Sequence, residues 1–159
     1  IAALNGHEVV ARLLLSLEGV DPDSKNASGQ TPLWLAARKG HDGVVRLLLE
    51  RKDVDPNSVD DHIKGQTPLM IAVQNGHEAV VRLLLERNNV EFNVRDRSGN
   101  TPLRCAVWFG HTTIAELLLG RNGIDAESKN ERGETLLWSS AAEGHKAIVR
   151  LLLKRDDID

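Results

Sequence analysis

Histidine is the residue in this sequence that first suggests chemistry, because five of its six histidines each follow a glycine at nearly constant spacing. The pairs are Gly6-His7, Gly40-His41, Gly76-His77, Gly110-His111 and Gly144-His145. Imidazole is the commonest metal ligand in proteins, and two nitrogens bound to one zinc ion lie within roughly 4 Å of each other. Neighbouring packed helices stand ~10 Å apart, so equivalent histidines cannot share an ion. We predict a structural role for these histidines and no metal site.

Other motifs that would bind a ligand or support catalysis are incomplete. Segment 21–26 is similar to a calcium loop, but it has Lys25 where an oxygen ligand is needed and Pro32 where the bidentate Glu belongs. Asp60-Asp61-His62 is better explained as a solvated loop, and Asn26-Ala27-Ser28 as a chance glycosylation acceptor sequence. The sequence has no glycine-rich phosphate loop and no serine elbow. We predict no catalysis, no cofactor and no small-molecule substrate.

The composition argues against a nucleic-acid-binding, a disordered or a membrane-spanning protein. The 159 residues carry a net charge of −3, which argues against a broad cationic surface for nucleic acid. A hydrophobic content of 41% is too high for a disordered chain, and no apolar run approaches the ~18 residues of a membrane span. Without a recognisable leader, we expect an intracellular protein of the cytoplasm or nucleus. Because the sequence opens at Ile1 without an initiator Met, we also expect it to be an excerpt of a longer chain.

The elements that position these residues repeat along the chain. Successive Gly-His pairs are 34, 36, 34 and 34 residues apart, and two further markers keep the same register. These markers are a Gly-x-Thr sequence that places Thr nine residues before each of the last four Gly-His pairs, and Leu triplets at 13–15, 47–49, 83–85, 117–119 and 151–153. Three markers in one register indicate about five copies of a single structural unit.

Each unit is predicted to contain two short helices. Thr31 can cap a helix whose first residue is Pro32, and Gly40 can end that helix in the left-handed conformation. A second helix follows with an apolar stripe at 3.6-residue spacing over 44–49. Tetratricopeptide repeats share the 34-residue period but use longer helices and short turns. Here more than a third of each unit is turn-forming sequence before Thr-Pro-Leu, which argues against that architecture.

The chain resembles the ankyrin repeat family. The resemblance rests on the sequences 31–37 (TPLWLAA) and 67–72 (TPLMIA), each followed by Gly-His and Val-Val-Arg-Leu-Leu-Leu, and it covers essentially the whole chain. It implies an all-α solenoid of helix-turn-helix units with projecting β-hairpin-like fingers. First helices would line a concave face and second helices the convex back. We expect a single array over 1–159, with repeats at about 1–20 (partial), 21–54, 55–90, 91–124 and 125–159.

The chain also departs from the family pattern. Each unit has one extra residue after its second helix, as at 18–20, and the position after Thr-Pro-Leu holds Trp34, Met70, Arg104 or Trp138 in place of histidine. The Thr–His hydrogen bond of the family is therefore absent. We predict that Trp34 and Trp138 are wedged between repeats. The last unit has Leu136 where the others have Pro, so we expect weaker local stability there.

The resemblance implies a non-catalytic module that binds another protein. In the family the two positions before Gly-His face the concave groove, and here the candidate contacts among them are Arg38, Lys39, Gln74, Asn75, Trp108, Phe109 and Glu143. Candidate contacts on the fingers are Lys25, Lys64, Arg95, Arg97, Lys129 and Arg132. The charges assigned to the finger tips, Asp60 and Asp96 among them, sum to +1 over four fingers, which favours a protein over a polyanion. Trp108 and Phe109 are the sharpest candidates. The alternative, that Trp108 packs on a neighbouring repeat, stays open.

Several further expectations concern single positions and the ends. Cys105 occupies the position of Leu35 and Ile71, so we expect a buried thiol. The two residues added between 57 and 65, around Asp60–Lys64 and including Ile63, are interpreted as a tolerated loop insertion. Neither end of the chain looks capped, because residues 1–3 match the inside of a first helix and 151–153 match an internal second helix. The alternative function is thus an architectural spacer, or a segment that self-associates through its ends.

Overall fold

In the computed structural model, which describes residues 1–61 and 64–155, the chain forms short helices joined by loops, and no strand is present among these residues. His62 and Ile63, part of the predicted loop insertion, lie outside the described residues. The helices of the described residues are α1 (Glu8–Leu15), α2 (Pro32–Lys39), α3 (Asp42–Leu49), α4 (Pro68–Gln74), α5 (Glu78–Leu85), α6 (Pro102–Trp108), α7 (Thr112–Leu119), α8 (Leu136–Ala142) and α9 (Lys146–Leu152).

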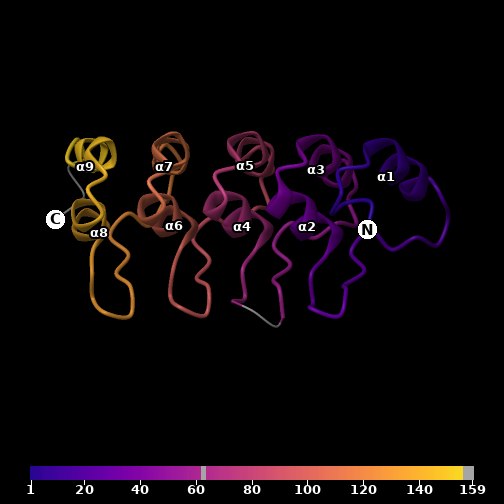
Figure 1. Ribbon diagram of the computed structural model, residues 1–159, viewed down its shortest axis with the longest axis horizontal. Coiled ribbons are helices and arrows are strands. Elements are labelled where there is room, and N and C mark those ends of the chain that lie inside the picture. Colours follow the sequence, from indigo (N-terminus) through magenta and orange to yellow (C-terminus); the bar gives the residue numbers. More distant parts are fainter. Residues whose placement is uncertain (62–63, 156–159) are drawn as a thin grey trace.

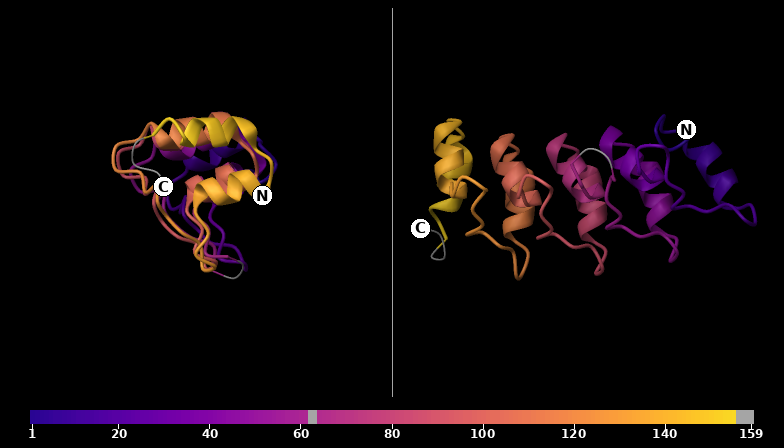
Figure 2. Two further views of the ribbon diagram at one scale, coloured as in Figure 1. Left: turned by 90° about the vertical axis from the view of Figure 1, so that its left-hand side faces the viewer. Right: turned by 90° about the horizontal axis from the view of Figure 1, so that it is seen from below.

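Helix pairs stand side by side in a row (Figure 1). The first helices α2, α4, α6 and α8 pack one against the next, and the second helices α1, α3, α5, α7 and α9 form a parallel layer behind them. Finger loops project away from both layers, and the two chain termini lie at opposite ends of the row (Figure 2). The predicted all-α solenoid with projecting fingers is confirmed.

Every first helix begins at a threonine cap. The Oγ1 atoms of Thr31, Thr67, Thr101 and Thr135 accept hydrogen bonds of 3.1–3.2 Å from the backbone N–H three residues later. Three of these helices have proline as their first residue, and α8 keeps its cap although Leu136 replaces the proline. The cap therefore depends on the threonine hydroxyl, and proline only sets the backbone angle in advance.

The hydrophobic core lies between units. Leu33, Leu69 and Leu103 occupy the same position in successive first helices and are 0% exposed, and Leu136, which stands at the proline position of α8, is 1% exposed. Small residues stand where these helices approach one another, and in the last unit Ser139 and Ser140 replace a larger apolar residue and an alanine. Their hydroxyls donate to the carbonyls of Thr135 and Leu137, so both polar groups are satisfied inside their own helix. A unit of this length buries its apolar surface only against its neighbours.

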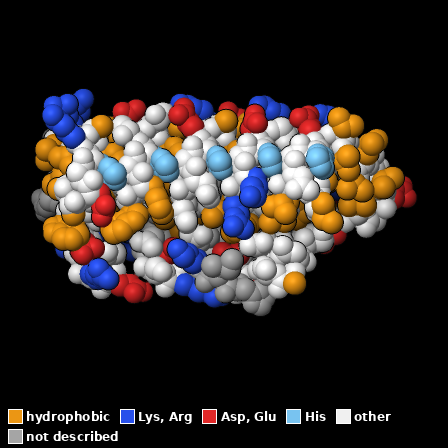
Figure 3. All heavy atoms as spheres, viewed as in Figure 1, with side chains coloured by type: hydrophobic (Ala, Val, Ile, Leu, Met, Phe, Trp, Pro, Cys, Tyr) orange, Lys and Arg blue, Asp and Glu red, His pale blue; other side chains and the backbone are white. Residues whose placement is uncertain are grey.

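The histidines connect each unit to the preceding one. Because a carbonyl oxygen can only accept, each ring donates from Nε2: His41 to the Leu4 carbonyl, His77 to Arg38, His111 to Gln74 and His145 to Trp108, at 3.0–3.3 Å. Figure 3 shows these side chains as a row along one face. Gly40 has φ +75°, and a Cβ there would lie 2.6 Å from Nδ1 of His77. The Gly-His motif is thus a contact between units, and the described residues contain no cluster suited to a metal ion.

Arginines make a second contact between units, on the side of the second helices. Arg51, Arg87 and Arg155 donate to the carbonyls of Leu15, Leu49 and Leu119, each at the C-terminal end of the preceding unit's second helix. The distances are 3.0, 2.6 and 2.8 Å. The last carbonyls of a helix have no N–H partner inside that helix, so each arginine satisfies one of them. The positive charge of the arginine also interacts favourably with the negative end of the helix dipole.

The ends of the array bear on two expectations. Residues 2–6 are assigned as turn, and the His7 N–H donates to the Ala2 carbonyl at 3.1 Å just as the His41 N–H donates to the Ala36 carbonyl at the end of α2, which agrees with the match of residues 1–3 to the inside of a first helix. Trp138 is 54% exposed, so the prediction that it is wedged between repeats is wrong. No described unit stacks beyond α8, whereas Trp34, which has such a neighbour, is 3% exposed as predicted.

Candidate functional site

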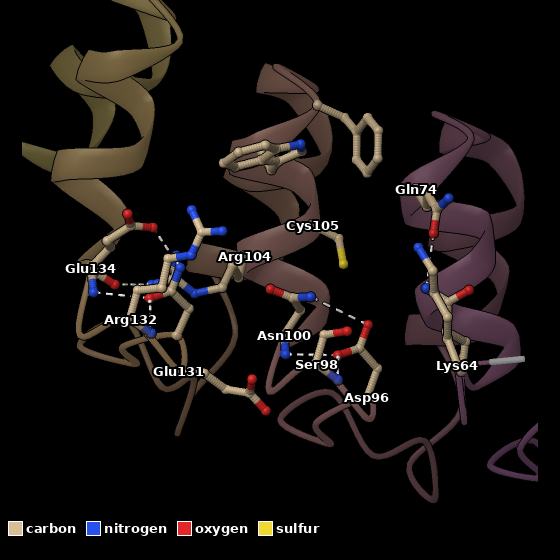
Figure 4. A pocket seen from close by; sticks show the side chains of 14 residues that line it. Lys64, Gln74, Asp96, Ser98, Asn100, Arg104, Cys105, Glu131, Arg132 and Glu134 are labelled. Atoms are coloured by element: carbon tan, nitrogen blue, oxygen red, sulfur yellow. Dashed lines mark hydrogen bonds between the residues drawn. The ribbon is translucent and has the colours of Figure 1, made fainter.

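A groove lies where the first helices meet the fingers, and its walls come from three successive units (Figure 4). We call it the central groove; its volume is about 370 Å³. Residues that line it are Lys64, Gln66, Gln74, Asp96, Ser98, Asn100, Arg104, Cys105, Trp108, Phe109, Asn130, Glu131, Arg132 and Glu134. Five of the candidate contacts predicted from the sequence meet here: Lys64, Gln74, Trp108, Phe109 and Arg132.

Two aromatic side chains form the apolar wall of the central groove. Trp108 is the last residue of α6 and is 47% exposed, and Phe109 follows it and is 46% exposed. The main-chain carbonyl of Trp108 accepts the His145 hydrogen bond, which holds the backbone here, and the ring of Phe109 stacks on His111 with centroids 6.2 Å apart. The question that the sequence left open is therefore answered in favour of exposure: Trp108 is not buried against a neighbouring repeat.

Arg104 forms the buried base of the groove. It stands in the position of the family's histidine, is only 2% exposed, and donates from Nη1 to the Ser139 hydroxyl at 3.0 Å. Its Nη2 donates to the main-chain carbonyls of Ser128, at 3.0 Å, and Glu134. All three acceptors are uncharged, and Nε has no partner among the described residues. Burial lowers the pKa of the Arg104 guanidinium, an effect that the charge of Glu134 partly offsets.

The fingers are held by side chains that the sequence interpretation placed at the tips. Asp96 accepts hydrogen bonds from the backbone N–H groups of Ser98 and Asn100 at 2.9 and 2.8 Å. Asp60 is fully buried and accepts from the backbone of its own finger in the same way. The expectation that both carboxylates are exposed finger-tip charges is therefore wrong. The available signal was an Asn or Asp shortly before each Gly-x-Thr, which is typical of side-chain-stabilised turns.

Three predicted finger contacts bridge neighbouring fingers. Lys25 Nζ lies 3.1 Å from the Asp61 carboxylate, and Arg97 Nη2 donates to the Asp61 carbonyl at 2.7 Å. Arg95 donates to the carbonyl of Lys129 at 3.1 Å and lies 3.4 Å from Asp125. These cations reach from one unit to the next because adjacent fingers are spaced within the length of a Lys or Arg side chain.

The other candidate contacts lie beside the groove rather than in it. Arg38 and Lys39 are exposed on α2, with the Arg38 guanidinium 5.6 Å from the ring centroid of Trp34. Asn75 is exposed after α4 and donates to its own helix at the Ile71 carbonyl. Lys129 and Glu143 are exposed in the last unit.

Comparison with known families agrees with this architecture. A model of three ankyrin repeats matches residues 1–60 and again 52–130, and a model of a single ankyrin repeat matches 132–159. The chain belongs to the ankyrin repeat family. Ankyrin repeats are generally protein–protein interaction modules without catalytic activity. A comparison with curated proteins gave no significant match.

Two further properties of the ankyrin array bear on its chemistry. Cys105 is 6% exposed, as predicted, and burial raises the pKa of its thiol to about 12, so it is protonated at neutral pH. Among the described residues, no helix has both the length and the apolar character that crossing a membrane requires.

Proposed function

We propose that this ankyrin array binds a partner protein through its concave first-helix face and its fingers, with the central groove as the main contact. The observation that carries the proposal is the pair Trp108 and Phe109. At the equivalent positions, α2 ends in Arg38 and Lys39, and α4 ends in Gln74 followed by Asn75. Two large aromatic side chains, each nearly half exposed, thus interrupt a polar row.

Energetics supports this choice of contact. Large rigid aromatic side chains dominate the binding energy of protein interfaces because they bury much apolar area and lose few rotamers. The hydrogen bond from His145 holds the backbone that carries Trp108 and Phe109, and the Phe109 ring also stacks on His111. A partner would therefore meet an ordered surface, and little ordering entropy would oppose binding.

The remaining candidate contacts have graded roles in the proposal. Gln74, Lys64 and Arg132 would contact the partner beside the aromatic pair. Residues along the same face extend the surface: Arg38, Lys39, Asn75, Lys129 and Glu143. Lys25, Arg95 and Arg97 would act mainly by holding the fingers in place, because their charged groups already bind the neighbouring finger.

A capture experiment with matched variants tests the proposed function. The wild-type chain, the double variant Trp108→Ala/Phe109→Ala and the control Glu116→Ala serve as baits in extract from the native source. Glu116 is exposed on the second helix α7, away from the groove. We expect one or more proteins to be retained by wild type and the control and lost by the double variant. Retention of the same proteins by all three baits would contradict the proposal.

Self-association is the second candidate function, because apolar side chains are exposed at both ends of the row. Val10, Leu13 and Leu14 of α1 are 46%, 63% and 43% exposed, while Ile148 and Leu152, which match Val10 and Leu14 in α9, are fully buried against the preceding unit. At the other end Leu153 is 65% exposed. The two ends thus present the two halves of an ordinary contact between units. Sedimentation of wild type and of Leu13→Glu/Leu153→Glu at increasing concentration tests this, since the like charges would repel where the two ends meet and only the wild type would associate.

A further inference from the structure

We propose that the central groove recognises an acidic segment of the partner, in which a carboxylate side chain stands next to a large apolar side chain. This inference rests on the proposed function and adds the chemistry of the bound segment. The apolar side chain would pack on Trp108 and Phe109. The carboxylate would lie toward the fingers, between Lys64 and Arg132 and over Arg104.

Charge on the binding face supports an acidic partner. Lys39, Lys64, Lys129 and Arg132 are exposed on this face, and none of them forms an ion pair within the described residues. Among the acidic side chains of these fingers, Asp60 and Asp96 are buried in their own loops, Asp61 pairs with Lys25 and Glu134 accepts a hydrogen bond from Asn130, whereas Glu131 is exposed. The groove lining combines the cations Lys64, Arg104 and Arg132 with the carboxylates Asp96, Glu131 and Glu134. Lys64 and Arg132 are its exposed cations without an ion pair among the described residues.

Arg104 adds a second, independent observation. The hydrogen-bond acceptors of this buried guanidinium are all neutral, and the charge of Glu134 offsets the cost of its burial only in part. The Glu134 carboxylate accepts a hydrogen bond of 2.6 Å from Asn130 Nδ2, and no ion pair among the described residues joins it to Arg104. A carboxylate that enters the groove would compensate this charge and would interact with it more strongly than in water.

The arrangement of the groove explains why the carboxylate and the apolar side chain should be adjacent in the segment that binds. Figure 4 shows Lys64 and Arg132 on opposite sides of the groove, with Arg104 between them on its own helix. Arg104 and Trp108 lie one helical turn apart in α6, so their side chains share a face of that helix. Neighbouring residues of an extended segment could therefore reach the cationic and the aromatic parts together.

A polyanion such as nucleic acid fits the same surface less well. Glu131 and Glu143 are exposed on the binding face, and Glu134 is half-buried in the groove itself. Carboxylates at these positions repel a continuous line of phosphates, whereas a short segment with one or two acidic residues avoids them.

Selection from a displayed library of random twelve-residue peptides tests the inference on the intact chain. We expect the enriched peptides to share an Asp or Glu adjacent to Leu, Ile, Met or Phe. One enriched peptide is then synthesised and titrated against wild type, Lys64→Glu/Arg132→Glu, Trp108→Ala/Phe109→Ala and a control, Lys52→Glu/Lys154→Glu. The control makes the same change of charge at exposed lysines that follow α3 and α9. Circular dichroism checks that each variant is folded.

Reversing the groove charges should weaken peptide binding about tenfold or more, and the control should change it less than about twofold. A peptide with Lys in place of its acidic residues should bind Lys64→Glu/Arg132→Glu better than it binds wild type. Binding should also weaken as salt is raised.

The outcomes separate this inference from the proposed function. Enriched peptides that lack acidic residues but depend on Trp108 and Phe109 would overturn the inference and leave the groove as a binding site. Peptides insensitive to both groove variants would overturn both proposals. A library that yields no enriched peptide, or a DNA duplex that binds as tightly as the peptide with the same dependence on Lys64 and Arg132, would also overturn the inference.

Discussion

The indole Nε1 of Trp34 donates a hydrogen bond of 3.0 Å to the carbonyl of Gln66, the residue immediately before the next threonine cap. Arg104, at the same position two units later, donates to the carbonyl of Glu134, which also precedes a threonine cap. Two unrelated side chains thus replace the family's histidine and make the same connection to the following unit. In both units the side chain at this position holds the backbone immediately before the threonine that caps the next first helix.

We predict that Trp34→Phe destabilises the array by about 1–3 kcal/mol. The substitution keeps most of the ring but leaves the Gln66 carbonyl without this donor, and a buried unpaired acceptor carries a desolvation cost of that size. Urea unfolding measures the change. Trp138→Phe is the control, since Trp138 is half exposed, and it should change stability by less than about 0.5 kcal/mol. Equal effects for both variants would contradict the role assigned to Trp34.

Because Gly40 lies against His77, we predict that adding one methyl group at Gly40 lowers the stability of the array strongly. In Gly40→Ala the new Cβ would carry the cost of the left-handed backbone, about 1–2 kcal/mol, and would also clash with His77. Gly123→Ala is a matched control, because φ there is +80° but no atom lies within 4 Å of the added Cβ. Thermal unfolding should show Gly40→Ala to be clearly the more destabilising. The same loss in both variants would mean that the histidine moves aside freely.

The arginines behind the second helices should contribute more than the exposed ion pairs. Arg87→Ala removes a charged donor from the helix-terminal carbonyl of Leu49, and we expect a loss of about 1.5–3 kcal/mol. Arg82→Ala removes an exposed ion pair with Glu78 and should cost at most about 0.5 kcal/mol. Urea unfolding of the two variants under the same conditions compares them. A smaller loss for Arg87→Ala would show that solvent satisfies the Leu49 carbonyl.

Cys105 predicts how stability changes at alkaline pH. Its thiol has an ordinary pKa of 9.0, and burial raises the pKa to about 12 in the folded chain. Above pH 9 the unfolded chain therefore loses this proton while the folded chain keeps it. Stability is unaffected below pH 9 and falls between 9 and 12, by about 1.4 kcal/mol per pH unit once deprotonation of the unfolded chain is nearly complete.

Cys105→Val isolates this effect. The sequence contains no tyrosine, and every titratable group other than this thiol is common to the two proteins. Between pH 8 and pH 10 the free energy of unfolding should therefore fall more in the wild type than in the variant. Parallel curves for the two proteins would show that the thiol is not protected by burial.

Sequence periodicity predicted the elements well and the contacts between units only in part. Thr31-Pro32 and Gly40 mark a helix by local chemistry, which needs no knowledge of neighbours. Trp34 and Trp138 share a sequence position but differ in burial, because among the described residues only Trp34 has a following unit that covers it. Sequence alone could not show that difference.

The central groove was predictable in its aromatic part and not in its polar part. Trp108 and Phe109 stood out because other units have polar residues there. Arg104 and Asp60 looked like ordinary charged positions, and their burial depends on acceptors or donors that the folded loops bring within reach. Lys25 and Arg95 were expected at a binding surface, but long side chains have many rotamers, and the bridging ones became evident only from the spacing of the fingers.

The most direct test of the central claim is a calorimetric titration of the captured partner, once purified, against three forms of the array. The account predicts that Trp108→Ala/Phe109→Ala weakens binding by about 2 kcal/mol or more, roughly 30-fold in Kd, with an unchanged circular dichroism spectrum. Glu116→Ala on the opposite side should bind as wild type does. Full affinity in the aromatic double variant, or a comparable loss in Glu116→Ala, would contradict the assignment of the central groove as the binding site.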